Sequence, residues 1–99
     1  MRVEQLPEAE KEIEHAVDYY EERSYGLGDD FLEEYHEMVG KIIAHPKRFS
    51  IARGKTRWAS LKRFPYKIIY WQDEHSETLY IIAVAHWKKR PFYWDTRMT

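Results

Sequence analysis

Apolar residues in the first part of the chain recur at helical spacing in two separate segments. The first segment begins with Pro7, and the acidic residues that follow it in the first turn favour a helix start. Its apolar stripe consists of Ala9, Ile13, Ala16, Val17 and Tyr20. The pattern ends at residues 23–26, so it predicts a helix with one side facing a core.

The second helical segment begins at Gly28-Asp29-Asp30 and ends at His45-Pro46, where the proline disfavours further helix. Its apolar stripe consists of Phe31, Tyr35, Met38, Val39, Ile42 and Ile43. Only a short turn containing Gly26 separates the two segments. They are therefore predicted to form an antiparallel helical hairpin.

After Pro46 the chain becomes rich in β-branched and aromatic residues, which are typical of strands. Strands are predicted at residues 58–64, 66–72 and 78–85, and a short extended segment at residues 2–5 precedes the first helix. The run from Leu79 to Ala85 is almost wholly apolar, which indicates a central strand covered on both faces. The aromatic and basic residues 86–99 are predicted to dock on the sheet as an irregular segment.

These elements predict an α+β fold in which an N-terminal antiparallel helical hairpin packs on a mainly antiparallel three- to four-stranded sheet. A chain of 99 residues is long enough for one hydrophobic core but not for two. No linker or internal repeat divides it. We expect a single domain that covers residues 1–99.

The composition is that of an ordered globular protein, with 43% hydrophobic and 33% charged residues. Cysteine is absent, which excludes disulfides and thiolate chemistry and is compatible with a reducing compartment. The sequence contains neither a signal-peptide pattern nor an apolar run of membrane-spanning length. We expect a cytoplasmic location and no membrane partner.

The net charge of −1 hides a difference between the two halves of the chain. Residues 1–52 contain 6 Lys and Arg against 13 Asp and Glu, whereas residues 53–99 contain 10 against 4. The C-terminal half therefore favours contact with a polyanion, since a local basic face concentrates phosphate even on a nearly neutral protein. A solvated sheet face balanced by acidic helices explains the same charges.

The five histidines show no paired metal-ligand spacing, and the sequence has no glycine-rich phosphate loop. We expect neither a metal ion nor another cofactor.

A series of local motifs runs through nearly the whole chain. They are Tyr19-Tyr20-Glu21-Glu22-Arg23-Ser24, Gly26-Leu27-Gly28, His45-Pro46, Arg57, Arg63-Phe64-Pro65-Tyr66-Lys67-Ile68-Ile69-Tyr70, Ala83-Val84-Ala85-His86, Arg90-Pro91-Phe92-Tyr93-Trp94 and Arg97. Their order and spacing, in a helical hairpin followed by a sheet, resemble the RelE/ParE superfamily, the toxins of type II toxin-antitoxin and plasmid stabilisation systems. The resemblance implies a bacterial toxin that is neutralised by a cognate antitoxin protein.

The superfamily divides by mechanism, and the resemblance implies two different targets. RelE-like members cut mRNA in the ribosomal A site, so the first interpretation is a metal-independent, ribosome-dependent mRNA endonuclease that inhibits translation. ParE-like members inhibit DNA gyrase without being nucleases, which gives the second interpretation. A degenerate toxin that only binds its antitoxin is the third.

RNA cleavage through the 2′-hydroxyl requires a base, an acid and cations near the phosphate. By the resemblance, Tyr93 matches the tail tyrosine of RelE-like nucleases and Lys67 takes the place of an arginine on the middle strand. His86 matches a position where several nucleases carry histidine, and its usual pKa suits proton transfer at neutral pH. The predicted catalytic set is His86 and Tyr93 for proton transfer, with Lys67, Arg90 and Arg57 as phosphate stabilisers. Trp87 departs from the pattern, since a further arginine is expected there.

Each of these residues also has a structural interpretation. His86 is placed to end a buried strand with a hydrogen bond, and Tyr93 to cover the sheet with its polar end in water. Arg90 and Arg97 are placed to pair with helix carboxylates and hold the tail down. Arg57 and Lys67 then become ordinary solvated positions on the outer face of the sheet.

Overall fold

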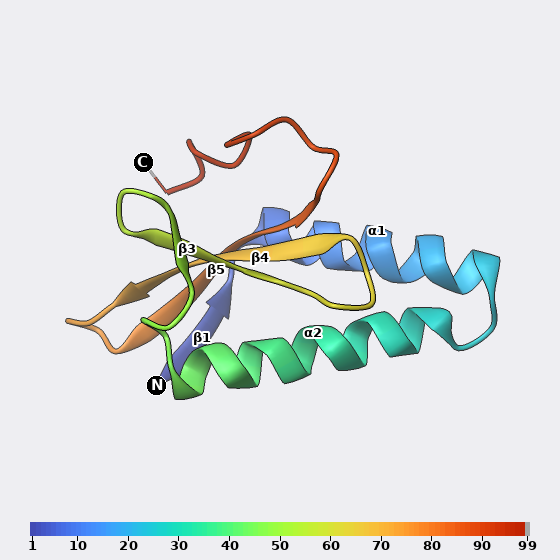
Figure 1. Ribbon diagram of the computed structural model, residues 1–99, viewed down its shortest axis with the longest axis horizontal. Helices are drawn as coiled ribbons and strands as arrows, with labels where there is room; N and C mark the ends of the chain where they lie inside the picture. Colours follow the sequence, from blue (N-terminus) through green and yellow to red (C-terminus); the bar gives the residue numbers. More distant parts are fainter. Residues whose placement is uncertain (99) are drawn as a thin grey trace.

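The computed structural model describes residues 1–98 and consists of two helices and one sheet (Figure 1). Its elements are β1 (Arg2–Gln5), α1 (Pro7–Arg23), α2 (Leu27–Ala44), β2 (Ser50–Arg53), β3 (Thr56–Ser60), β4 (Tyr66–Asp73) and β5 (Thr78–His86). The strand order is β1-β5-β4-β3-β2, and every neighbouring pair is antiparallel except β1 with β5. The α+β class and the helical hairpin are confirmed. Neither helix in the described residues is long and apolar enough to cross a membrane.

The sheet has five strands instead of the predicted three to four, because two short edge strands, β1 and β2, join it. Strand β3 covers Thr56–Ser60 instead of residues 58–64. The loop after it is held by the Glu34 carboxylate on α2, which accepts bonds from the backbone N–H groups of Lys62 (2.7 Å) and Arg63 (3.1 Å). These N–H groups bond to a side chain instead of a neighbouring strand, which ends β3 early.

The two helices approach each other closely where the hairpin turns. Gly26 has a left-handed φ of +85°, which a glycine adopts without strain. A Cβ atom on Gly28 would lie 2.7 Å from the backbone oxygen of Val17 on α1. The Glu21 carboxylate accepts hydrogen bonds from the N–H groups of Gly26 (2.9 Å) and Gly28 (3.0 Å), and so satisfies donors at the start of α2. Glycine at position 28 therefore allows the hairpin to close.

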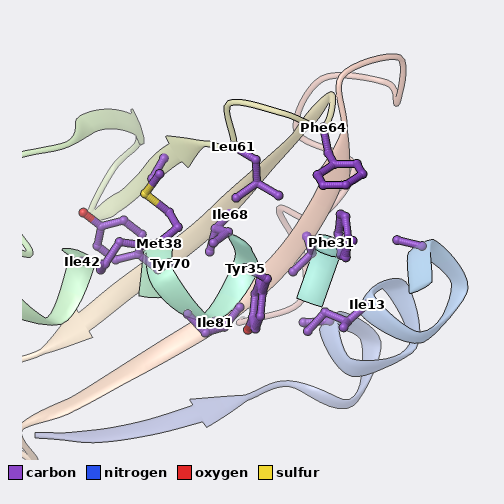
Figure 2. Packing of buried hydrophobic residues seen from close by; sticks show 14 of the residues in the cluster. Ile13, Phe31, Tyr35, Met38, Ile42, Leu61, Phe64, Ile68, Tyr70 and Ile81 are labelled. Carbon is purple, nitrogen blue, oxygen red and sulfur yellow. The ribbon is translucent and has the colours of Figure 1, made fainter. Parts of the chain in front are cut away.

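The main core lies between the helices and one face of the sheet. Figure 2 shows Ile13 of α1, Phe31, Tyr35, Met38 and Ile42 of α2, and Ile68, Tyr70 and Ile81 of the sheet in this layer, with Leu61 and Phe64 from the β3–β4 loop. Phe31 packs edge-on against Phe64, with ring centres 5.2 Å apart. Both predicted helical stripes thus face the sheet, except for Ile43 at the end of the second stripe, which is 37% exposed. We call this face of the sheet the helix side and the opposite face the outer side.

The outer side of the sheet is covered in part by the tail, residues 87–98, which crosses it on the side away from α2 (Figure 1). Trp94 is only 4% exposed and packs with Ile69, Ile82 and Ala83 in a second, smaller core. The prediction of an irregular tail docked on the sheet is confirmed for the described residues; Thr99, its last predicted residue, lies outside them.

Candidate functional site

The predicted site residues are distributed over both faces of the sheet. Arg57 is paired with Tyr70, and His86 with Tyr66, so both face the helix side with their partners. Lys67 lies between Tyr66 and Ile68 on β4 and therefore faces the outer side. Along β4, the partners of Arg57 and His86 are four residues apart, which corresponds to about 13 Å. The five residues therefore do not converge on one point.

A bulge in β5 decides which way His86 points. Ile69 pairs with Ala83 and Tyr70 with Ile81, so that Ile82 has no partner on β4. Ile82 and Ala83 both contribute to the outer core, and the alternation is shifted after them. Simple alternation from Leu79 places His86 on the outer side near Lys67, whereas the bulge turns it to the helix side.

The His86 ring packs edge-on against Tyr66, with ring centres 5.1 Å apart. Its Nδ1 accepts a hydrogen bond from the backbone N–H of Lys88 (3.0 Å). In the neutral ring this places the proton on Nε2, so the lone pair that a general base needs is already engaged by the main chain. The arrangement matches the structural interpretation of His86 as a residue that ends a buried strand.

Tyr93 lies in a cluster with Glu12 of α1 and Arg97 of the tail, which we call the edge cluster. The Tyr93 hydroxyl donates a hydrogen bond to Oε2 of Glu12. Arg97 donates to both carboxylate oxygens, at 2.9 and 3.1 Å, and its guanidinium carbon lies 5.0 Å from the centre of the Tyr93 ring. The expected pairing of Arg97 with a helix carboxylate is confirmed.

The edge cluster closes the side of β5 that β1 leaves open. Strand β1 pairs with β5 only as far as Ile81. Beyond that point the Val84 N–H donates to Glu12 (3.0 Å), and the Ile82 carbonyl accepts from Arg97 (3.0 Å). Side chains thus replace the missing strand and satisfy backbone groups that cannot remain unpaired in a partly buried position.

Burial raises the pKa of Tyr93 far above its usual range, and the hydrogen bond and charge of Glu12 raise it further. Burial alone lowers the pKa of Arg97, but its hydrogen bond and attraction to Glu12 reverse this, so that the pKa is raised. The Tyr93 hydroxyl therefore holds its proton firmly and directs it at Glu12. In this geometry it is a structural donor.

Glu12 was not among the predicted site residues, although the sequence carries a signal for it. It lies three residues after Ala9 and four before Ala16, and both alanines are buried. A carboxylate at this spacing falls on the core-facing stripe of α1, and a buried carboxylate requires a cationic or hydrogen-bonding partner. The sequence could not reveal which cation in the chain provides it.

The three predicted cations have separate surroundings. The Nζ of Lys67 lies 5.0 Å from the centre of the Trp58 ring on the outer side. Arg57 is half-buried and donates to the Phe49 carbonyl (2.6 Å), while Arg90 is exposed in the tail. In residues 1–98, none of the three lies within 4.0 Å of a carboxylate oxygen.

The predicted catalytic residues do not surround a common point. An RNA-cleaving site needs an acid and a base on opposite sides of one phosphate, with cations beside it. Here Tyr93 is bonded to Glu12, His86 faces the other side of the sheet from Lys67, and Arg57 lies at the far end of the strands. Nor do residues 1–98 hold any group of three His, Asp or Glu side chains that could bind a metal ion.

Both the sequence and the fold are similar to those of known proteins. The sequence matches the family model described as ParE toxin of type II toxin-antitoxin system, parDE, over residues 3–91. Among solved structures, a chain of the chromosomal ParDE toxin-antitoxin system from P. aeruginosa has a similar fold, with a TM-score of 0.61 at 12% sequence identity. The alignment covers 87% of this chain and 95% of the other. No curated protein matches the sequence significantly.

Proposed function

This chain belongs to the ParE toxin family of type II toxin-antitoxin systems, and we propose that it acts as a non-enzymatic toxin that inhibits DNA gyrase by binding to it. An antitoxin, as the family implies, is its neutralising partner. The target is taken from the resemblance to ParE-like toxins, which inhibit gyrase without being nucleases. In this proposal the protein acts through a surface that binds another protein, and it catalyses no reaction.

The observation that carries the proposal is the hydrogen bond from Tyr93 to Glu12. A nuclease of the RelE-like kind relies on its tail tyrosine at the scissile phosphate. In this chain the same tyrosine joins the tail to α1, and its raised pKa, caused first by burial, removes it from acid-base work near neutral pH. The exposed Trp87, 58% accessible where an arginine is expected, agrees with a binding role.

A second candidate is the ribosome-dependent mRNA endonuclease, and one observation favours it. The outer side carries Lys67 beside Trp58, and Trp71 stacks on Tyr80 with ring centres 5.4 Å apart. Aromatic rings next to cations bind single-stranded RNA by stacking and charge. This surface supports RNA binding, but it lacks an adjacent acid and base.

The test compares the two activities with the same two variants. Purified wild-type chain is added to gyrase in a DNA supercoiling assay, and separately to ribosomes that translate a reporter mRNA. Tyr93→Phe and His86→Ala are measured beside it, with thermal melting as a check on folding. We expect supercoiling to be inhibited by all three proteins and the mRNA to remain intact.

Cleavage of the mRNA by the wild-type chain, lost in both variants, would overturn the gyrase proposal in favour of the nuclease. Absence of both activities in a chain that still binds its antitoxin would instead indicate the degenerate toxin. Pulse labelling in a bacterial host gives the same distinction in cells, since gyrase inhibition stops DNA synthesis first and mRNA cleavage stops protein synthesis first.

A further inference from the structure

A cavity of about 430 Å³ opens between the loop after α2 and the β4–β5 turn, far from the edge cluster. Arg57 and Tyr70, neighbours across β3 and β4, lie in its wall. Lys47, Lys55 and Glu74 also line it. We call this the Arg57 cavity.

Arg57 is a half-buried arginine in the cavity wall, and most of its N–H donors have no hydrogen-bond acceptor in the described residues. One N–H donates to the Phe49 carbonyl (2.6 Å), which fixes the guanidinium in place. The guanidinium has five N–H donors, and no other acceptor within residues 1–98 bonds to it. A partly desolvated cation that is held in position but not neutralised is suited to binding an anion.

The polar neighbours of Arg57 are already bonded elsewhere. The Tyr70 hydroxyl donates to the Pro46 carbonyl (2.6 Å). Glu74 pairs with Lys47 (3.0 Å), and Asp73 accepts hydrogen bonds from the Ser76 hydroxyl (2.9 Å) and the His75 N–H (3.1 Å). None of these groups bonds to the Arg57 guanidinium.

The sequence around Arg57 contains no carboxylate that could pair with it. Residues 38–72 contain nine Lys and Arg and no Asp or Glu. This stretch includes β2, β3 and most of β4, so the Arg57 cavity lies in a positive segment. Three of its cations, Lys47, Arg53 and Arg63, pair with carboxylates from outside the segment, whereas Arg57 does not. An anion bonded to Arg57 would therefore come from another molecule.

The apolar surroundings indicate a protein ligand. Ile51 on the edge strand β2 is the neighbour of Arg57 across the sheet, shares its face, and is 61% exposed. An exposed isoleucine beside a cation suits a polypeptide that presents a carboxylate and an apolar side chain together. A phosphate backbone offers no apolar group to contact Ile51.

We propose that the Arg57 cavity receives an Asp or Glu side chain of the antitoxin, bonded to the Arg57 guanidinium, with an apolar antitoxin residue against Ile51. The inference rests on the proposed function only in that it requires an antitoxin. It does not depend on whether gyrase is the target. Removal of one partner from such a charge pair weakens association through faster dissociation.

The experiment measures the dissociation constant between the purified chain and the antitoxin encoded beside it, by isothermal titration calorimetry. Arg57→Gln is compared with Lys62→Gln, which removes the same charge from the same positive segment but at an exposed loop position away from the cavity. We expect Arg57→Gln to raise the constant about tenfold or more and Lys62→Gln to change it less than about threefold. Arg57→Lys keeps the charge and a donor for Phe49, so it should recover part of the affinity.

Equal effects of Arg57→Gln and Lys62→Gln would overturn the proposal, because they would indicate a general charge effect. Arg57→Gln that leaves antitoxin binding unchanged, but weakens binding of a single-stranded RNA oligonucleotide, would overturn it in favour of a phosphate ligand. Thermal melting of each variant controls for folding. Arg57→Glu should abolish binding, and an antitoxin in which the paired Asp or Glu is replaced by Arg should restore it. Such a restored affinity would identify the antitoxin carboxylate.

This design separates the inference from the proposed function. If the wild-type chain binds no antitoxin, the assignment as a neutralised toxin fails together with the inference. If the wild-type chain binds the antitoxin but does not inhibit gyrase, only the proposed target fails. The change in the antitoxin dissociation constant caused by Arg57→Gln then still tests whether the cavity binds the antitoxin.

Discussion

Replacement of Glu12 by alanine is the most direct test of how the sheet edge is closed. The Glu12 carboxylate bonds to the Val84 N–H, the Tyr93 hydroxyl and the Arg97 guanidinium. Alanine removes all of these bonds and leaves Arg97, whose side chain is 15% exposed, without its carboxylate. The tail then loses its polar attachment to α1, although Trp94 still packs on the sheet.

The size of the effect follows from these contacts. Removal of one partner from a buried ion pair costs about 3–5 kcal/mol, and the 15–18% exposure of this pair places it at the lower end. An unpaired, partly buried Val84 N–H costs about 1–3 kcal/mol, part of which water recovers. Alanine has a higher helix propensity than glutamate, which offsets about 0.3 kcal/mol of this loss. We expect a net loss of about 4 kcal/mol, which lowers Tm by roughly 16–32 °C for a domain of this size.

The assay is thermal and urea unfolding of Glu12→Ala, Glu12→Gln and Glu14→Ala. Glu14 is an exposed residue of the same helix, so its replacement should change the stability by less than about 0.5 kcal/mol. Glu12→Gln removes the charge but keeps an acceptor, and it should fall between the other two. A Glu12→Ala protein that is as stable as Glu14→Ala would refute the idea that the edge cluster holds the sheet edge.

Two further predictions concern the hairpin and the buried tyrosines. Gly28→Ala should cost about 1–3 kcal/mol in unfolding measurements, because the new methyl group meets the Val17 backbone oxygen at 2.7 Å, whereas Gly40→Ala, with open space around it, should stabilise α2 by about 0.5–1 kcal/mol. A neutral Gly28→Ala would contradict the close approach. Stability should also fall as pH rises above 10, because burial raises the pKa of Tyr70 to about 12, so the unfolded chain loses this proton first. Absorbance at 295 nm during alkaline titration should show tyrosine ionisation that coincides with unfolding, and ionisation of all tyrosines in the folded protein would contradict it.

The helices could be predicted closely, because their stripes are long and their boundaries are marked by Pro7, Gly26 and Pro46. Of the two edge strands, β1 coincides with the extended segment predicted at residues 2–5, but β2 was not predicted. β2 has only four residues, and its pairing with β3 depends on a turn at Gly54, whose φ is +57°. Short segments of this kind carry too little periodicity to distinguish a strand from a loop.

The site was harder to predict than the fold, since it depends on contacts between distant residues. The bulge at Ile82 leaves no mark in an apolar run, yet it determines the direction of His86. The bond between Glu12 and Tyr93 joins residues 81 positions apart. The sequence indicated that both Arg90 and Arg97 pair with helix carboxylates; in the described residues Arg97 does so, and Arg90 forms no ion pair.

The opposite charges of the two halves contribute to the fold at a few points of contact. Carboxylates of the helices bind the basic half at separate points, Glu12 at Arg97, Glu34 at the loop after β3, and Asp30 at Arg63 (3.3 Å). All of these contacts lie along the helices or the β5 edge. The opposite edge of the sheet, around Arg57, receives no helix carboxylate in the described residues. Since no helix carboxylate reaches the cations beyond the end of α2, the positive charge around Arg57 is the part of the surface that an acidic partner is best placed to complete.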